Sequence, residues 1–143
     1  MRQIRGLIYK RITDVNDALF PLCWNLNTNT FIEAERRTYE KQSLIIQDEF
    51  YHFEAIFSDD EFVGFTAYWL IDGNIFGEQL AIVEKYRNCG IGSACVKHTL
   101  SQGKTMTIEV ELPGEEMHDR RIALYQRLGF VMNDFKHYQC KFR

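Results

Sequence analysis

Runs of apolar residues, some alternating with polar ones and some continuous, mark the segments of this chain that are expected to form strands. Each run is rich in β-branched or aromatic residues, which strands favour. The predicted strands before residue 84 are Ile4–Ile12, Tyr51–Ser58, Phe62–Ile71 and Ile75–Val83. Turn-forming residues at Asp59–Glu61 and Asp72–Asn74 separate the last three, so these strands are predicted to be joined by tight turns.

Two helices are predicted between the first two strands. Thr13 is a residue type that favours the N-cap, and the first helix is expected over residues 14–26. Pro21 is expected to disturb the middle of this helix or to mark a short break. The polar stretch Asn27–Thr30 predicts a loop, and Phe31–Ile46, with charged residues on one side, predicts a second helix.

The C-terminal part of the chain predicts helices and strands in alternation. The expected elements are a helix over Ile91–Gln102 ending at Gly103, a strand over Thr105–Leu112, a helix over Glu115–Leu128 ending at Gly129, and a last strand from Phe130. The complete order, β-α-α-β-β-β-α-β-α-β, predicts one mixed α/β domain over residues 1–143.

Composition excludes several classes of protein. The chain is 45% hydrophobic, which excludes a disordered protein, and its formal net charge of −3 includes no run of like charges. We therefore expect neither a nucleic-acid nor a membrane partner. No N-terminal signal core is present, and four cysteines without a CxxC pair favour free thiols, so a cytoplasmic location is expected. The histidines and cysteines have no metal-ligand spacing, and no metal is expected.

The most informative local feature is a pair of glycines, Gly90 and Gly92, placed where a predicted strand leads into a predicted helix. Glycines let a ligand approach the backbone, and the unpaired N–H groups of a helix N-terminus favour anions. A dinucleotide fingerprint is excluded because Cys95 occupies its third small position, and Lys97 lies too far along the helix for a P-loop. Two glycines alone leave both an anion site and a plain turn open.

The wider string "LAIVEKYRNCGIG" resembles motif A of the GNAT acyl-CoA N-acyltransferases, R/Q-x-x-G-x-G/A after an apolar strand. Arg87 stands at the R/Q position, and Gly90 and Gly92 stand at the small positions. Downstream, "IALYQRLGF" resembles the end of the family's motif B, with Tyr125 at the tyrosine and Gly129 at the glycine. The resemblance covers roughly residues 62–138.

This resemblance implies a GNAT-like domain in which helices flank a mostly antiparallel sheet with a splayed parallel pair. It also implies an N-acetyltransferase that moves an acetyl group from acetyl-CoA to a primary amine by direct attack. Backbone amides of the glycine loop would hold the pyrophosphate, and the preceding strand edge would align the thioester. The implied cofactor-binding residues are Leu80, Ala81, Ile82, Arg87, Asn88, Cys89, Gly90, Ile91, Gly92 and Ser93.

Two residues are candidates for catalysis. Tyr125 matches the family tyrosine that acts as general acid toward the departing sulfur, although a core aromatic is the alternative. Strict alternation in Ile75–Val83 places Phe76, Glu78, Leu80 and Ile82 on one face. Glu78 is then a provisional base, acting through water or with a raised pKa, or else a solvated residue or the partner of a nearby arginine.

The resemblance is incomplete at the C-terminus. Family members end with two strands after the Gly-Phe pair, whereas 13 residues follow Phe130, which is enough for one. The missing return strand leaves three alternatives: a truncated chain, a minimal fold, or an edge supplied by another chain. Because an uncovered edge favours pairing, a homodimer through this edge is a hypothesis. An alternative function is a non-catalytic acyl-CoA-binding or regulatory module. The acceptor stays open among aminoglycosides, polyamines, amino acids and protein N-termini.

Overall fold

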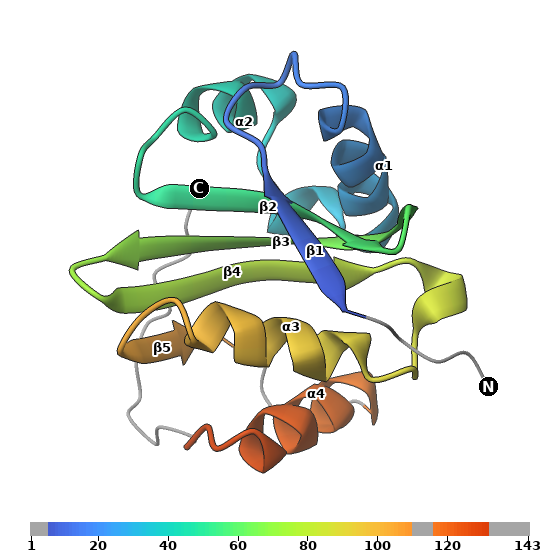
Figure 1. Cartoon of the computed structure of the whole chain (residues 1–143), viewed down its shortest axis with the longest axis vertical. Helices are drawn as coiled ribbons and strands as arrows, with labels where there is room; N and C mark the ends of the chain where they lie inside the picture. Colours follow the sequence, from blue (N-terminus) through green and yellow to red (C-terminus); the bar gives the residue numbers. More distant parts are fainter. Residues whose placement is uncertain (1–5, 110–115, 132–143) are drawn as a thin grey trace.

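A computed structural model describes residues 6–109 and 116–131, with only the backbone described over 116–121. The elements in chain order are β1 (Leu7–Arg11), α1 (Phe20–Thr30), η1 (Glu33–Glu35), α2 (Tyr39–Ile45), β2 (Tyr51–Ser58), β3 (Glu61–Ile71), β4 (Asn74–Ile82), η2 (Glu84–Tyr86), α3 (Ile91–Leu100), β5 (Thr105–Ile108) and α4 (Glu116–Arg127) (Figure 1). Here η denotes a 3-10 helix. The mixed α/β class predicted from the sequence is confirmed.

The five described strands form one sheet in the order β1-β2-β3-β4-β5. Neighbouring strands from β1 to β4 are antiparallel, whereas β5 pairs with β4 in parallel. The parallel pairing covers only Asn74–Gly77 of β4. Beyond Gly77, β4 has no paired neighbour on that side among the described residues, and a cleft lies there between β4 and residues Ile108 and Glu109.

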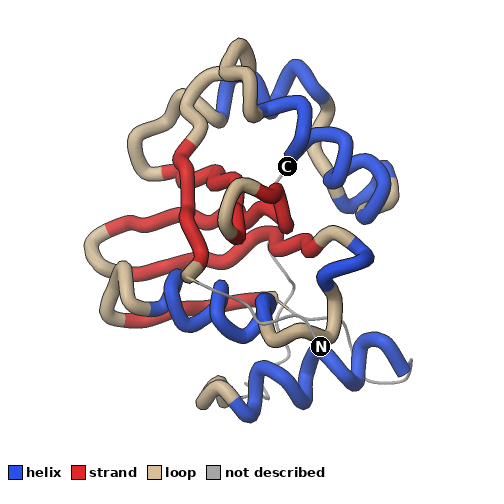
Figure 2. Tube along the Cα trace, turned by 45° about the vertical axis from the view of Figure 1, so that its right-hand side comes forward, coloured by secondary structure: helices blue, strands red, loops and turns tan. Residues whose placement is uncertain are grey.

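Helices cover both faces of this sheet, which forms the middle layer in Figure 2. On one face, α1 and α2 enclose a core that includes the fully buried Phe53 and Phe65. On the other face, α3 encloses a second core around Ile56, Val63 and Ile91. In Figure 1, α1 and α2 lie above the sheet, and α3 and α4 lie below it.

The first helix begins later than predicted. It starts at Phe20, and Pro21 lies in its first turn, where a missing backbone N–H costs no helical hydrogen bond. Thr13 is not its N-cap. Instead, the carboxylates of Asp14 and Asp17 accept hydrogen bonds from the backbone N–H groups of Asn16 and Leu19, which folds the preceding segment into turns.

The next segment also differs from the prediction. Residues Asn27–Thr30 are the last turn of α1 and not a loop, since Asn27 is buried and its side chain bonds to Gln79. The single predicted helix Phe31–Ile46 is divided into η1 and α2. Arg36 ends η1 with an extended backbone, and Thr38 begins α2 as its N-cap, where its hydroxyl accepts a hydrogen bond from Lys41 N at 3.2 Å.

The strand predictions from Tyr51 to Val83 are confirmed with shifts of one residue at three ends. Strand β5 is described over four residues, and the rest of the predicted strand to Leu112 lies largely outside the described residues. The predicted final strand also falls almost entirely on residues 132–143, outside the described part. Dimerisation through a free edge therefore stays a prediction. No helix within residues 6–109 and 116–131 is long and apolar enough to cross a membrane.

Candidate active site

The glycine loop connects β4 to α3 through a short turn of left-handed backbone. Asn88 and Gly90 have φ values of 63° and 82°, the second of which favours glycine strongly. Gly90 is the N-cap of α3, where no side chain accepts a capping hydrogen bond. The guanidinium of Arg87 ties the loop back to β4 by donating from Nε to the carbonyl of Ile82 at 2.9 Å.

The first turn of α3 is open to a ligand. A Cβ atom added at Gly92 would meet nothing within 4 Å, and its backbone is not left-handed, so neither packing nor φ requires glycine there. Ile91 is buried in the core below, while Gly92 and Ser93 are half-buried. The Cys89 thiol points back to the carbonyl of Arg87 at 3.5 Å. The loop therefore has the geometry of an anion site formed by backbone N–H groups.

A cleft of about 60 Å³ opens where β4 and β5 diverge. Strands β3, β4 and β5 and helices α3 and α4 all contribute side chains to it. Among the predicted site residues, Glu78, Leu80 and Tyr125 line this cleft. The side chains of Cys95 and Thr99 line it from α3, the same helix that begins at the glycine loop. The strand edge and α4 thus share one cleft, whereas residues 87–93 of the glycine loop do not line it and are joined to it through α3.

A β-bulge at Glu78 corrects the predicted alternation of β4. Ala67 and Tyr68 are consecutive in β3 but pair with Gln79 and Gly77, so Glu78 is the extra residue. Its side chain consequently reaches the α1–α2 face, whereas Leu80 packs in the core beneath α3. The prediction that Glu78 and Leu80 share one face was wrong, because one inserted residue reverses the two-residue period.

The residues after the bulge divide between the two faces. Ala81 is buried in the core of the α1–α2 face, so only its backbone could contact a cofactor in the cleft. Ile82 packs in the core beneath α3, and it does not line the cleft. Of the three β4 residues that were predicted to contact the cofactor, Leu80 is the one whose side chain lies at the cleft.

Glu78 is held by two side-chain donors, which sequence reasoning did not identify by residue. Arg37 donates from Nη1 to Oε1 of Glu78, and Trp69 donates from Nε1 to Oε2 at 2.9 Å. Arg37 is 7% exposed, and burial lowers its pKa, but the hydrogen bond and charge of Glu78 outweigh burial and raise it. The predicted alternative of a nearby arginine partner is confirmed. No sequence spacing links residues 37 and 78.

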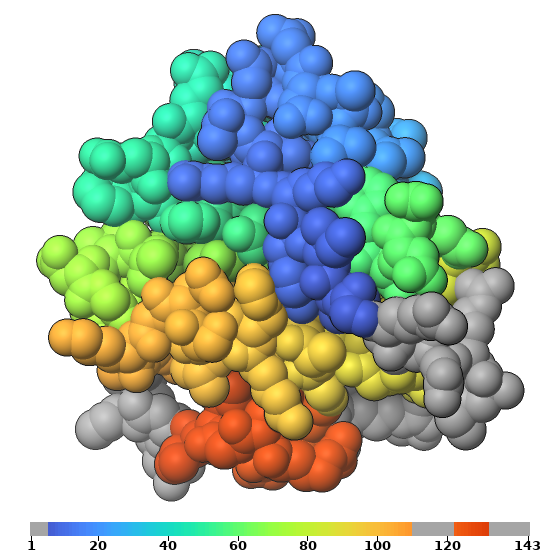
Figure 3. Space-filling view, viewed as in Figure 1, coloured from blue at the N-terminus to red at the C-terminus, as the bar shows by residue number. Residues whose placement is uncertain are grey.

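Tyr125 is half-buried on α4 and packs edge-on against Phe130 at a ring-centroid distance of 5.6 Å. At the C-terminal end of α4, the N–H of Phe130 donates a hydrogen bond to the carbonyl of Tyr125 at 3.0 Å. On the surface, α4 lies beside α3, as Figure 3 shows. The turn at Gly129, with φ of 97°, therefore positions the motif tyrosine at the cleft.

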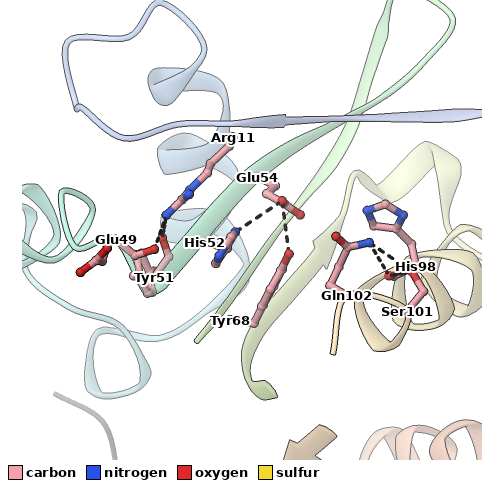
Figure 4. A network of polar contacts seen from close by, with 9 residues as sticks. All are labelled: Arg11, Glu49, Tyr51, His52, Glu54, Tyr68, His98, Ser101 and Gln102. Carbon is pink, nitrogen blue, oxygen red and sulfur yellow. Dashed lines mark hydrogen bonds and ion pairs between the residues drawn. The ribbon is translucent and has the colours of Figure 1, made fainter. Parts of the chain in front are cut away.

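A buried carboxylate, Glu54, lies behind the cleft and was not predicted. Tyr68, which lines the cleft, donates its hydroxyl to Oε2 of Glu54 at 3.3 Å, and His52 Nδ1 lies 4.0 Å from the same oxygen (Figure 4). Burial raises the pKa of Glu54, against the opposing effects of the Tyr68 hydrogen bond and the Arg11 charge. Burial and then Arg11 lower the pKa of His52.

Comparison with known proteins identifies the family. The model of the GNAT acetyltransferase family matches residues 16–130. A solved structure of a GNAT-family protein from Bacteroides thetaiotaomicron is similar with a TM-score of 0.83 and 31% identity, covering 92% of this chain and 76% of that one. No curated protein sequence matches this chain significantly.

More distant structures share the fold. Arabidopsis thaliana Naa50, solved with the bisubstrate analogue CoA-Ac-MVNAL, has a TM-score of 0.67 at 22% identity, covering 96% and 92% of the two chains. The protein AAC(6')-Iy, solved with the bisubstrate analogue CoA-S-monomethyl-acetylneamine, has a TM-score of 0.62 at 14% identity, covering 95% and 100% of the two chains. The family match and the Bacteroides structure show that this chain belongs to the GNAT acetyltransferase family and is an acyltransferase.

Proposed function

We propose that this protein transfers an acetyl group from acetyl-CoA to a primary amine by direct attack. The observation that carries the proposal is the diverging β4 edge, which brings Glu78, Leu80 and Tyr125 onto one cleft. Helix α3 runs from that cleft to the glycine loop. An acyl-CoA could thus lie with its thioester in the cleft and its pyrophosphate at the α3 N-terminus.

In the proposed reaction, the amine nitrogen attacks the thioester carbonyl carbon, and the carbon–sulfur bond then breaks to release coenzyme A. Tyr125 would donate a hydrogen bond to the departing sulfur, since a phenol stays protonated at neutral pH. The attacking nitrogen must also lose a proton. Each Glu78 oxygen accepts from one donor and keeps a lone pair, so Glu78 stays the candidate to orient the amine and to accept its proton through water.

The structural relatives include an aminoglycoside acetyltransferase and a protein solved with the bisubstrate analogue CoA-Ac-MVNAL, so aminoglycosides and peptides belong in the first acceptor screen. The preceding step is acetyl-CoA binding, measured by calorimetric titration of the wild-type chain and of Gly90→Glu. The variant forces a side chain onto a left-handed backbone and brings a negative charge to the proposed pyrophosphate site. We expect micromolar binding that the variant loses by about 100-fold or more.

A matched control is Gly6→Glu, which adds the same charge at an exposed position with open space around its Cβ. Equal binding by the wild type and Gly90→Glu would contradict the pyrophosphate assignment. Acetyl-CoA binding without transfer to any amine of a broad panel would instead favour the non-catalytic acyl-CoA-binding module.

A further inference from the structure

A second pocket lies on the α1–α2 side of the ion pair between Arg37 and Glu78. It encloses about 350 Å³ and is lined by Trp24, Glu33, Arg36, Arg37, Thr38 and Tyr39. Arg37 lines this pocket and binds Glu78, which lines the cleft. The ion pair is therefore a wall shared by the two hollows. An acceptor in this pocket would have its amine beside Glu78 and its other end against α1 and α2.

Two of the three described charged residues that line the pocket are arginines. Arg37 is buried, and its Nε has no hydrogen-bond partner among the described residues, although its Nη1 binds Glu78. Arg36 is half-buried, and its Nε donates to the carbonyl of Phe31 at 3.2 Å. No ion pair to Arg36 occurs within residues 6–109 and 116–131. A guanidinium carries five N–H donors, so Arg36 retains donors for an anion, whereas the Nε of Arg37 is buried away from solvent.

Negative charge in the pocket is weaker. Glu33 is its only lining carboxylate and is exposed, where water and salt screen its charge. Glu78, next to the pocket, is already paired with Arg37. A polycationic acceptor would need several unpaired carboxylates, and here it would meet one exposed carboxylate, Glu33, and the guanidinium of Arg36. A carboxylate on the acceptor would find the bidentate donors that it prefers.

The remaining walls are aromatic. Trp24 of α1 and Tyr39 of α2 meet edge to face at a ring-centroid distance of 5.8 Å, and both line the pocket. Together they offer an apolar surface to the carbon chain of a small acceptor. The pocket thus combines an aromatic wall with the guanidinium of Arg36.

We propose that the acceptor is a small amine that carries a carboxylate, with that carboxylate held by Arg36. This inference rests on the proposed amine acetylation and narrows it to one substrate class. It separates this chain from acetyltransferases whose acceptors are polycations. Arg36 is a specificity-determining residue in this scheme, since it contacts the non-reacting end of the acceptor.

The test compares acceptors that differ only in the carboxylate. Amino acids with terminal amines, from glycine to 6-aminohexanoate, are set against alkylamines of the same chain length and against an aminoglycoside, with coenzyme A release as the assay. We expect kcat/KM to favour the amino acids by about 10-fold or more at one chain length. A preference for the alkylamines or the aminoglycoside would overturn the inference.

Two variants test whether Arg36 causes the preference for amino acids over alkylamines. Arg36→Gln is expected to remove it by raising KM for the amino acids while kcat changes little. Lys41→Gln makes the same charge change at an exposed position of α2 outside the pocket and is expected to keep it. An equal preference in Arg36→Gln and Lys41→Gln would overturn the role of Arg36.

Binding can also be followed without turnover. The chain has two tryptophans, of which Trp24 lines the pocket and Trp69 bonds to Glu78, so intrinsic fluorescence reports on this region. We expect 4-aminobutyrate to change the fluorescence at lower concentration than butylamine, and Arg36→Gln to abolish the difference. Such binding without acetyl transfer would overturn the proposed function and support the pocket assignment. Acetyl transfer without a carboxylate preference would overturn the inference alone.

Discussion

The two faces of the sheet at β4 differ in the kind of group that makes the polar contacts. On the α3 face, the proposed pyrophosphate site is a continuous loop, and its donors are backbone N–H groups near Gly90 and Gly92. On the α1–α2 face, the carboxylate of Glu78 is held by side chains that come from residues 37 and 69. The first site is local in sequence, whereas the second joins the β3–β4 hairpin to Arg37, which lies 41 residues before Glu78.

This difference explains why the sequence predicts the site on the α3 face better than the side-chain network on the α1–α2 face. A backbone site needs particular conformations at neighbouring residues, and glycine at a strand–helix junction records that need directly. A side-chain network needs only that its members meet in space. Arg37 lies in a charged stretch that resembles any solvated helix face, yet it is buried against Glu78.

The largest effect is expected from Arg37→Ala, which removes the cation that binds Glu78 on the α1–α2 face. Removing Arg37 leaves Glu78 charged and partly buried without its cation, and we expect the free energy of unfolding to fall by about 3–5 kcal/mol. Urea denaturation measures this loss. Since such a loss can unfold a small domain, the double variant Arg37→Met with Glu78→Leu removes both charges and should recover most of it. A loss below about 1 kcal/mol in the single variant would contradict a buried pair.

Tyr125→Phe separates catalysis from packing at the cleft. Loss of the hydroxyl is expected to lower kcat by about 100-fold with little change in KM for acetyl-CoA, because the hydrogen bond to sulfur strengthens as the bond breaks. Steady-state kinetics with the best acceptor measures it. Tyr9→Phe removes a hydroxyl from β1 outside the cleft and serves as control. Unchanged kcat with lower thermal stability would assign Tyr125 to the core.

Gly92→Ala tests the proposed pyrophosphate site, which is formed by backbone N–H groups on the α3 face. A Cβ at Gly92 meets nothing within 4 Å, so folding should tolerate it, and alanine is the better helix former. A bound pyrophosphate would meet the new methyl group, and we expect acetyl-CoA to bind about 10-fold more weakly, equivalent to about 1.4 kcal/mol. Calorimetry and a thermal melt give both quantities. Full affinity in a folded Gly92→Ala would place the phosphates elsewhere.

The smallest expected effect concerns Glu54, whose pKa is raised by burial above its usual value of 4.5. A raised pKa means that the folded state favours the protonated form. The stabilisation is complete below pH 4.5 and is lost as the pH rises through the folded-state pKa. The stability of Glu54→Gln relative to the wild type should therefore increase as the pH rises above 4.5.

Urea unfolding at a series of pH values tests this prediction. His52 contributes in the opposite sense, because its lowered pKa gives stability that is lost as the pH falls through the folded-state value. The exposed Glu40→Gln is the control for a changed surface charge. Parallel pH profiles for the wild type and Glu54→Gln would contradict the burial effect.

The errors in the predicted fold share one cause. Thr13 is a residue type that favours the N-cap, but the helix begins at Phe20, where the buried side chains of Phe20 and Cys23 can reach the core. Similarly, the polar stretch Asn27–Thr30 reads as a loop, but Asn27 stays helical because it is buried and bonded to Gln79 of β4. Local propensity differs between these alternatives by less than tertiary burial contributes.

By itself, the sequence determined the order of the strands, the glycine loop and the motif tyrosine. These depend on a two-residue alternation, on residues that permit left-handed backbone, and on spacing along a single helix. Only the tertiary structure decided the orientation of Glu78. One bulge turned it from the Leu80 face toward Arg37 and Trp69, because the pairing of β4 with β3 depends on contacts between strands that no single segment encodes.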